Sequence, residues 1–199
     1  LLAHHDIMLR RKISDDLLAW KNTPKKKCLL VTGARQIGKT FIIEDFARKN
    51  YTNYIYINFE LMPAMKSVFD GDLDVDSIVR NLSIRFPKVN FVPGNLLIFL
   101  DEIQSCPNAR VSLKSFSMDG RFDVIASGSL LGLNYKEVSS YPVGYETVAE
   151  MHSLDFEEFL WALGVGEQII SYVSDAIKKK IPIDTSVLEK MEEYYRWYG

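Results

Sequence analysis

Residues 28–40 read Cys-Leu-Leu-Val-Thr-Gly-Ala-Arg-Gln-Ile-Gly-Lys-Thr. The first five are apolar or β-branched and predict a short buried strand, and the last eight match the pattern G-x-x-x-x-G-K-[ST]. Residues 41–49 carry apolar side chains at positions 41, 42, 43 and 46, which predicts a helix packed on a sheet. A strand, a glycine-rich loop and a helix in this order are the setting in which the pattern binds phosphate. The stretch therefore predicts an α/β fold built around a phosphate-binding loop.

The loop contains the residue types that triphosphate binding requires. Gly33 and Gly38 let the backbone curl so that successive N–H groups point at phosphate oxygens, and the helix that follows adds the positive end of its dipole. Lys39 is expected to neutralise the β and γ phosphates, and the Thr40 hydroxyl to ligate Mg²⁺. The alternative, a chance glycine-rich turn, has to match four fixed positions by accident. The nucleotide contacts are expected from Gly33, Ala34, Arg35, Gln36, Ile37, Gly38, Lys39, Thr40 and Phe41.

An acidic pair ends a second buried segment. Residues 96–100 are continuously apolar, as in a strand buried on both faces, and Asp101 and Glu102 follow directly. Adjacent carboxylates are costly near a dry sheet unless a cation is present, so Asp101 is predicted to hold a magnesium-bound water. Glu102 is predicted to orient and deprotonate the attacking water. The alternative interpretation is a helix cap at the end of the strand.

Polar side chains also end two further predicted strands. Ser127 and Ser129 follow the strand at 123–126, and the carboxyl ends of parallel strands border the ligand crevice. A hydroxyl there can sense the γ-phosphate or position the water; Ser127 is the first choice and Ser129 the second, against a plain glycine turn. Two interpretations of Asn58 stay open, a hydrogen bond to Glu102 that gates it and a satisfied amide at a strand end.

Strand-like and helix-like segments alternate along the chain, which predicts a mostly parallel sheet covered by helices. The predicted strands are 28–32, 54–59, 96–100, 123–126 and 147–151. The predicted helices are 13–21, 41–49, 78–86, 109–116, 155–163, 167–179 and 185–197. Asp155 and Glu158 form an Asp-x-x-Glu capping box. Residues 131–145 are predicted to form a loop.

Composition narrows the function classes. Apolar residues make up 47% and charged residues 25% of the 199 residues, and the formal net charge is −2, so nothing global indicates nucleic acid or an anionic membrane. The basic runs 25–27 and 178–180 lack aromatic or arginine neighbours and are interpreted as solvated segments. Cys28 and Cys106 have no metal spacing, and no apolar run approaches a membrane span, so a cytoplasmic location is expected. The residues before Met8 are interpreted as upstream sequence, and His4 with His5 as a terminal segment rather than a metal pair.

Five short segments occur in an order that resembles a known family. They are 33–40, Tyr56-Ile57-Asn58-Phe59-Glu60, Leu100-Asp101-Glu102-Ile103-Gln104, Ser127-Gly128-Ser129, and Leu154-Asp155-Phe156-Glu157-Glu158-Phe159-Leu160. Together they resemble the prokaryotic AAA-type ATPases that carry a C-terminal domain of unknown function, relatives of the archaeal ATPase group. The resemblance runs from about Met8 to Gly164.

The resemblance implies a P-loop NTPase core with a five-stranded sheet in the order 5-1-4-3-2, and Asp101 and Glu102 as its acidic motif. Residues 1–164 are then the ATPase domain, and residues 165–199 a helical segment that begins a further domain. That domain is nuclease-like in some relatives, and nucleic acid is expected to bind only through it.

One departure from the family concerns arginine. Many members carry an arginine after Pro-Val-Gly, whereas Tyr145 follows Pro142-Val143-Gly144 in this chain. Arg35 and Arg110 are the candidate substitutes within the chain. Otherwise a second copy or a protein partner is expected to supply an arginine.

Three functions compete. The leading one is a magnesium-dependent ATPase that couples hydrolysis to a conformational change, with Glu102, Lys39 and Ser127 as catalytic residues and ATP with Mg²⁺ as ligands. The second is a nucleotide-dependent switch with little turnover, which the missing loop arginine favours. The third, a phosphotransferase, needs an arginine-rich lid that the sequence lacks. An Asn-Lys-x-Asp guanine motif and a Leu-Ser-Gly-Gly segment are both absent, which disfavours a GTPase and a transporter ATPase.

Overall fold

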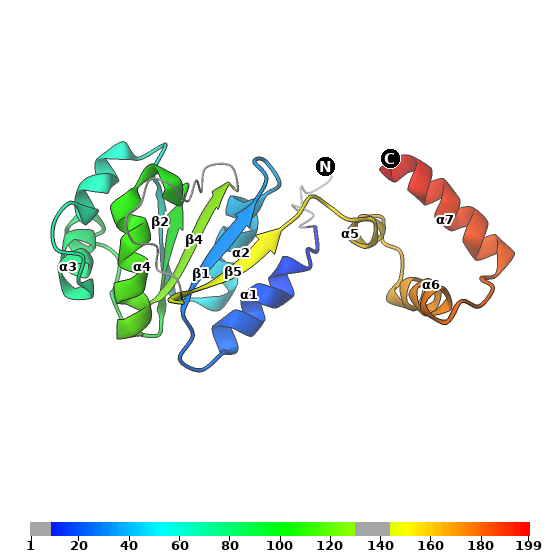
Figure 1. Cartoon of the computed structure of the whole chain (residues 1–199), viewed down its shortest axis with the longest axis horizontal. Helices are drawn as coiled ribbons and strands as arrows, with labels where there is room; N and C mark the ends of the chain where they lie inside the picture. The colour runs from blue at the N-terminus through cyan, green and yellow to red at the C-terminus, as the bar shows by residue number, and fades with distance from the viewer. Residues whose placement is uncertain (1–8, 130–143) are drawn as a thin grey trace, which may run out of the picture. The chain divides into compact units, whose positions relative to one another are not determined.

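A computed structural model describes residues 9–129 and 144–199 of the chain (Figure 1). These residues form two compact units. The sheet unit spans Ile13–His152, and the helical unit combines residues 9–12 with Ser153–Gly199. In the described ranges, none of the helices combines the length and the apolar character that a membrane crossing demands.

The sheet unit contains a five-stranded parallel sheet within the described residues. Its strands are β1 (Cys28–Gly33), β2 (Asn53–Asn58), β3 (Leu96–Asp101), β4 (Asp123–Ser129) and β5 (Glu146–Met151). The spatial order is β2-β3-β4-β1-β5, which confirms the predicted order 5-1-4-3-2. Because all neighbours are parallel, the carboxyl ends of the strands meet at one edge of the sheet. The phosphate loop, Asn58, Asp101 and Ser129 therefore lie at the same edge.

Helices cover both faces of the sheet, because β1 and β3 are apolar on both sides. Leu97 and Phe99 of β3 belong to a buried cluster with α1 (Ile13–Asn22) and α2 (Lys39–Asn50). Ile98 and the other alternate residues of β3 belong to a second cluster with α3 (Val75–Arg85) and α4 (Pro107–Asp119). The predicted sandwich of helices around a central sheet is thus confirmed, and each face is closed by its own core.

The structure adds elements that the sequence patterns did not indicate. A 3₁₀ segment, η1, spans Pro63–Phe69, and a single 3₁₀ turn, η2, spans Ile103–Ser105. Helix α3 starts earlier than predicted because the Asp74 side chain caps it by accepting a hydrogen bond from Ser77 N at 2.9 Å. Most of the predicted loop 131–145 lies outside the described residues, and so do Met8, His4 and His5.

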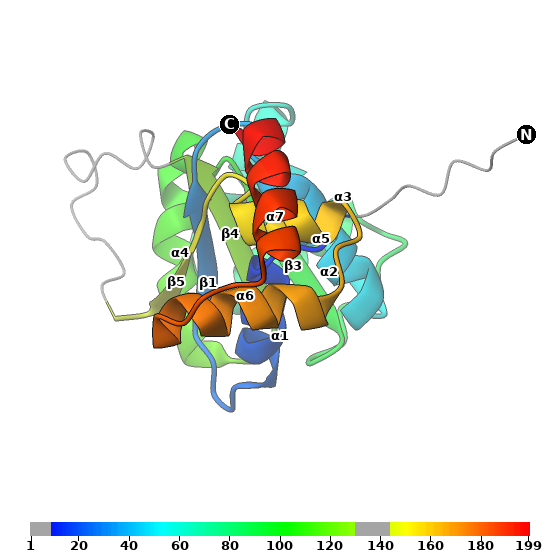
Figure 2. The same ribbon diagram turned by 90° about the vertical axis from the view of Figure 1, so that its right-hand side faces the viewer.

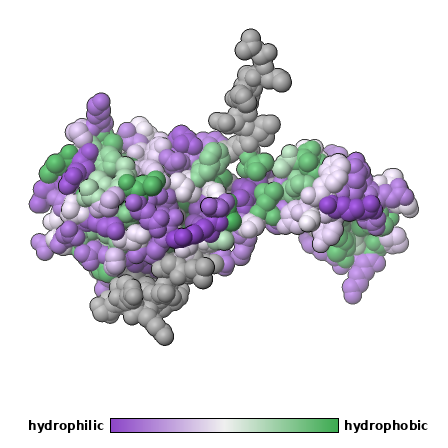
Figure 3. Space-filling model, turned by 90° about the horizontal axis from the view of Figure 1, so that it is seen from above, coloured by the Kyte–Doolittle hydropathy of each residue, from purple (hydrophilic) through white to green (hydrophobic). Residues whose placement is uncertain are grey.

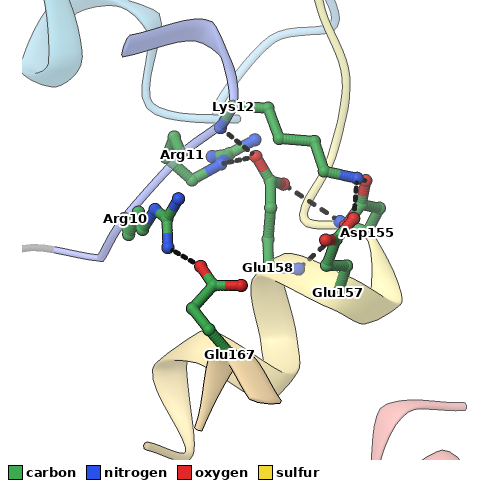
Figure 4. A network of polar contacts seen from close by, with 7 residues as sticks. All are labelled: Arg10, Arg11, Lys12, Asp155, Glu157, Glu158 and Glu167. Carbon is green, nitrogen blue, oxygen red and sulfur yellow. Dashed lines mark hydrogen bonds and ion pairs between the residues drawn. The ribbon is translucent and has the colours of Figure 1, made fainter. Parts of the chain in front are cut away.

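The helical unit contains α5 (Phe156–Ala162), α6 (Glu167–Lys179) and α7 (Thr185–Tyr198). The capping box predicted for α5 is confirmed: Glu158 N donates to Asp155 Oδ1 at 2.8 Å, and Asp155 N donates to Glu158 Oε2 at 3.1 Å. The same Glu158 carboxylate also accepts a hydrogen bond from Lys12 N at 2.7 Å and forms an ion pair with Arg11, whose Nε lies 3.2 Å from Oε1 (Figure 4). This buried carboxylate therefore caps α5 and anchors residues 11–12 to it.

Flanking ion pairs extend this anchor. Lys12 Nζ lies 2.6 Å from Asp155 Oδ2 and 2.7 Å from Glu157 Oε2, and Arg10 pairs with Glu167 (Figure 4). These outer pairs are about half exposed, so each contributes little by itself. The buried Glu158 contacts are consequently the stronger part of the network.

The helical unit buries little apolar surface. Leu160, Ile170 and Met191 form its buried cluster, while Ile177 and Tyr195 are more than 60% exposed. Figure 2 shows α6 and α7 running in different directions, and a groove of ≈ 770 Å³ lies among the residues of α5, α6 and α7. Figure 3 shows hydrophobic residues, in green, on the surface of both units. The expected domain boundary at residue 164 falls inside this unit, after α5.

The close approach of β5 to the phosphate loop makes Gly33 sensitive to substitution. A Cβ atom on Gly33 would lie 2.2 Å from the Met151 carbonyl oxygen and 2.8 Å from Ile37 Cδ1. We expect Gly33→Ala to lower the free energy of unfolding of the sheet unit by about 1–3 kcal/mol, because the backbone of β5 has to move. The measurement is urea unfolding followed by fluorescence of Trp20, in a chain whose Trp161 and Trp197 are replaced by Phe.

Gly71→Ala is the matched control for this prediction. A Cβ atom there meets nothing within 4 Å, so the change is expected to stay within about 0.5 kcal/mol. Equal losses in the two variants would contradict the proposed contact with β5.

Candidate functional site

The phosphate loop joins β1 to α2 at the carboxyl edge of the sheet. Gly33 pairs with Ser129 of β4 and with Met151 of β5, so the loop starts at a fixed place between two strands. Gly38 has a φ of 91° and forms the N-cap of α2, a left-handed conformation that glycine adopts without a steric penalty. The loop therefore delivers the N-terminus of α2, with its free N–H groups, to this edge.

The Lys39 side chain folds back over the loop. Its Nζ donates to Gly33 O at 3.1 Å and to Ala34 O at 2.5 Å, and the residue is 7% exposed. Burial lowers the pKa of Lys39, and the charges of Glu102 and Asp101 act in the opposite direction. The hydrogen-bond partners of the amine are thus uncharged carbonyl groups, while the charges of both carboxylates act on its pKa.

Asp101 ends β3 and is 2% exposed. Its Oδ2 accepts hydrogen bonds from Thr40 Oγ1 at 2.9 Å, Tyr56 OH at 3.1 Å and Asn58 Nδ2 at 3.2 Å. Its Oδ1 accepts from the Ser127 hydroxyl and from Glu102 N at 3.0 Å. Donors from α2, β2 and β4 thus converge on one buried carboxylate, which is what a buried charge requires.

The side-chain amide of Asn58 makes hydrogen bonds through both its nitrogen and its oxygen. It pairs in register with Asp101 across the β2–β3 ladder, so the two side chains leave the sheet at the same position. Its Nδ2 donates to Asp101, and its Oδ1 accepts from Glu60 N at 3.0 Å and Leu61 N at 2.9 Å. Of the two interpretations of Asn58, the satisfied amide at a strand end agrees with the structure, and the bond to Glu102 does not: the amide contacts Asp101 and the backbone after β2.

Tyr56 is a site residue to which the sequence analysis assigned no role. It lies two positions before Asn58 on β2, its ring lies 5.2 Å from that of Phe99, and its hydroxyl donates to Asp101. Burial raises the pKa of Tyr56 to about 12, and the charge of Asp101 adds to the shift. The phenol therefore remains a protonated donor at neutral pH. The alternation of Tyr56 and Asn58 at a strand end is the signal that would have identified it.

Glu102 follows Asp101 in a left-handed conformation, with φ 51° and ψ 49°. Its carboxylate Oε2 accepts a hydrogen bond from Gln104 Nε2 at 2.5 Å. Gln104 is the second residue to which the sequence analysis assigned no role.

The two serines differ in what they contact. Ser127 is fully buried and its hydroxyl donates to Asp101, so its contact within the described residues is the carboxylate. Ser129 is 4% exposed and lies opposite Gly33. At the other end of the nucleotide-contact run, Phe41 is 52% exposed on the first turn of α2.

Neither candidate arginine contacts Asp101 or Glu102. Arg110 Nη2 pairs with Glu146 Oε1 at 2.6 Å, and Glu146 begins β5, opposite the first residue of β1. Arg110 is therefore at the amino edge of the sheet, away from the loop, which corrects its assignment as a substitute. Arg35 is 71% exposed and lies 3.8 Å from Glu60.

Tyr145 also lies at the amino edge. Its carbonyl accepts from Ser117 Oγ at 2.5 Å, and the same Oγ accepts from Cys28 N at the start of β1. An arginine at position 145 would begin about one strand length, ~20 Å, from the phosphate loop of the same chain. Residues 142 and 143 of the Pro-Val-Gly segment lie outside the described residues.

The donor set of the site consists of oxygen atoms. Among the described residues, no group of three or more His, Cys, Asp or Glu side chains is arranged to hold a metal ion. The Thr40 hydroxyl and the Asp101 carboxylate lie 2.9 Å apart, and hydroxyl and carboxylate oxygens with water are the ligands that Mg²⁺ accepts beside a bound phosphate.

Comparison with known proteins agrees with this geometry. A family model described as an AAA domain matches residues 25–160, which is more than half of the chain. The uncharacterized protein MJ1544 of Methanocaldococcus jannaschii is 29% identical over 161 residues. That similarity covers 80% of this chain and 34% of the relative, so the chain spans about a third of the relative's length.

The contact between Asn58 and Asp101 generates a prediction about pH. Asn58→Asp places a second carboxyl 3.2 Å from Asp101 Oδ2, and we expect it to lower the free energy of unfolding at pH 8 by about 1–3 kcal/mol. The neighbouring charge raises the pKa of the introduced carboxyl above its unfolded value, so the penalty is full at high pH. It shrinks as the pH falls towards 5 and the carboxyl takes up a proton.

Urea unfolding at pH 8 and pH 5, relative to the natural chain at each pH, measures this effect. Asn53→Asp, at the other end of β2, is the control and is expected to show no comparable pH dependence. A deficit for Asn58→Asp that is equal at both pH values would show that repulsion by Asp101 is not its cause.

Proposed function

This chain belongs to the AAA domain family, whose members in general bind and hydrolyse nucleotides, and we propose that it binds ATP with Mg²⁺ and hydrolyses the ATP. The observation that carries the proposal is the meeting of Lys39, Thr40 and Asp101 at one edge of the sheet, at the N-terminus of α2. A cation, a hydroxyl and a carboxylate in this arrangement match the needs of a triphosphate and its metal ion.

The run from Gly33 to Phe41 is proposed to hold the nucleotide. Backbone N–H groups of the loop and of the first turn of α2 face phosphate oxygens, and the Lys39 amine exchanges its carbonyl partners for them. Thr40 and Asp101 are proposed to hold Mg²⁺, which, when bound, neutralises charge on the phosphates. Tyr56, Asn58 and Ser127 keep the Asp101 carboxylate in place through the hydrogen bonds described above.

Glu102 is proposed to be the general base. It directly follows Asp101 at the carboxyl edge of the sheet, and its charge acts on the pKa of Lys39, the residue proposed to bind the γ-phosphate. A carboxylate there can orient a water molecule and accept its proton. The proposed part of Ser127 is to position Asp101, because its hydroxyl is committed to that carboxylate.

The proposal also covers what hydrolysis drives, where an arginine comes from and which nucleotide is preferred. We expect hydrolysis to drive a conformational change, an arginine to come from a second copy or a protein partner, and ATP to be preferred over GTP because the guanine motif is absent. The two free, buried cysteines fit a reducing cytoplasm.

One observation favours an alternative function, a nucleotide-dependent switch with little turnover. Arg110 is occupied by Glu146 at the amino edge, and Arg35 lies beside Glu60. Neither neutralises the developing charge at the γ-phosphate in the arrangement described. A chain that binds ATP and hydrolyses it only with a partner arginine would fit both observations.

The first test concerns binding. Lys39→Ala removes the buried cation, and we expect the affinity for Mg²⁺·ATP to fall about 100-fold or more, because two or more charge-assisted hydrogen bonds to phosphate are lost. Isothermal titration calorimetry measures the dissociation constant. Lys49→Ala, on the last turn of α2, is the control and should leave it unchanged. An unchanged affinity in Lys39→Ala would contradict nucleotide binding by this loop.

The second test separates hydrolase from switch. Glu102→Gln keeps the size of the side chain but removes the base, so we expect ATP affinity to be retained and steady-state turnover to fall about 10²- to 10⁴-fold. Phosphate release at saturating ATP measures turnover. It is measured with and without an excess of further copies of the chain, which could supply the proposed arginine. If the natural chain binds ATP but releases phosphate no faster than this variant, the switch replaces the hydrolase.

A further inference from the structure

The geometry points to Gln104 as a positioning residue for the base: its side-chain amide holds the Glu102 carboxylate in the orientation from which it acts on water. This inference rests on the proposed function and adds a residue to it. Gln104 Nε2 donates to Glu102 Oε2 at 2.5 Å, and both residues belong to one tight turn after β3.

The backbone of Glu102 is the first step of the argument. Its φ of 51° and ψ of 49° are left-handed, a region that residues with a Cβ atom rarely adopt and that persists only where the surroundings enforce it. Here Glu102 N donates to Asp101 Oδ1 at 3.0 Å, and Glu102 O accepts from Ser105 N at 2.9 Å. The direction in which the Glu102 side chain leaves the backbone is therefore fixed from both sides.

The backbone turn that carries Gln104 is also held firmly by its neighbours. Gln104 is the middle residue of η2, between Ile103, which is fully buried in the core of the α3–α4 face, and Ser105. Cys106, 4% exposed, follows, and its N–H donates to Ile103 O at 3.1 Å. The core side chains on either side of Gln104 thus prevent the turn from rotating, and the amide is presented to Glu102 from a rigid support.

Among the residues that the structure describes, Glu102 is the hydrogen-bond partner of the Gln104 amide. Gln104 Oε1 is buried and accepts no hydrogen bond within the described part of the chain. Since a carboxylate only accepts hydrogen bonds, the nitrogen side of the amide has to face Glu102. Within residues 9–129 and 144–199, the hydrogen bond of this side chain is therefore with the proposed base.

A flexible glutamate samples several rotamers, and only some of them face the attacking water. A hydrogen bond from a rigid donor selects one of these orientations. The consequence is a specific kinetic expectation: loss of the Gln104 amide should reduce kcat and leave the binding of ATP unaffected, because the phosphate loop and Asp101 do not contact it.

The experiment uses Gln104→Met, which keeps the length of the side chain and removes the donor. We expect kcat for ATP hydrolysis to fall about 10- to 100-fold, with KM and the ATP dissociation constant within about twofold of the natural chain. Gln104→Asn, which retains an amide on a shorter side chain, should recover part of the loss. Gln168→Met, at the start of α6, is the matched control and should match the natural chain.

A double variant distinguishes positioning from a general structural effect. If Gln104 acts through Glu102, the chain with both Glu102→Gln and Gln104→Met should be no slower than Glu102→Gln alone. A double variant slower by the product of the two losses would overturn the inference, and so would Gln104→Met with full kcat. In either case a slow Glu102→Gln chain leaves the proposed hydrolase intact.

A second readout does not depend on turnover. The side-chain NH₂ resonances of Gln104, assigned by their loss in Gln104→Met, should lie away from those of a free glutamine and move in Glu102→Ala. Resonances at the free position that do not respond to Glu102→Ala would overturn the inference even if the natural chain hydrolyses no ATP. Absence of turnover in the natural chain together with responsive resonances would instead count against the hydrolase and retain the contact.

Discussion

The buried carboxylate of Asp101 is the point on which the arrangement of this edge of the sheet depends. An ionised carboxylate at 2% exposure is stable only if its oxygen atoms accept enough hydrogen bonds to replace water. The donors come from Thr40 on α2, Tyr56 and Asn58 on β2, and Ser127 on β4. Each donor contact also fixes the element that carries it. The parallel sheet makes the convergence possible, because it brings the carboxyl ends of all these strands together.

Much of this could be predicted from local sequence, because the signals are periodic or belong to a compact motif. The apolar run 96–100 indicated β3, and the pattern 33–40 indicated the loop with its strand and helix. The target of Asn58 could not be predicted in the same way. It depends on the register of β2 against β3, which pairs Asn58 with Asp101. The left-handed backbone of Glu102 then gives its carboxylate a different direction from that of Asp101, so the Asn58 amide contacts Asp101. A register and a single backbone dihedral angle leave no pattern in the sequence.

The contacts of residues on short turns and at helix ends could not be predicted from the sequence for a related reason. Gln104 lies on a three-residue 3₁₀ turn, which is too short for any hydrophobic period to appear. Arg110 lies on a helix that was predicted, but the edge of the sheet that it faces follows from the packing of α4 against β5 and the pairing with Glu146. Glu158 shows both cases in one residue. Its capping box is local and was predicted, whereas its bonds to Arg11 and Lys12 bridge nearly 150 positions.

The charges at the edge of the sheet explain why the site is suited to a charged ligand. Burial lowers the pKa of Lys39, the charges of Glu102 and Asp101 oppose that effect, and the amine donates to neutral carbonyl groups. The free-energy cost of removing Lys39 and the two carboxylates from water is already included in the folded state. In the proposed function, a triphosphate would exchange the neutral hydrogen-bond acceptors of Lys39 for a more strongly charged set, without a further desolvation of the amine. Preorganisation of this kind lets a small group of buried polar residues bind a charged ligand with little rearrangement. It explains why several hydrogen-bond donors at this edge of the sheet converge on one aspartate.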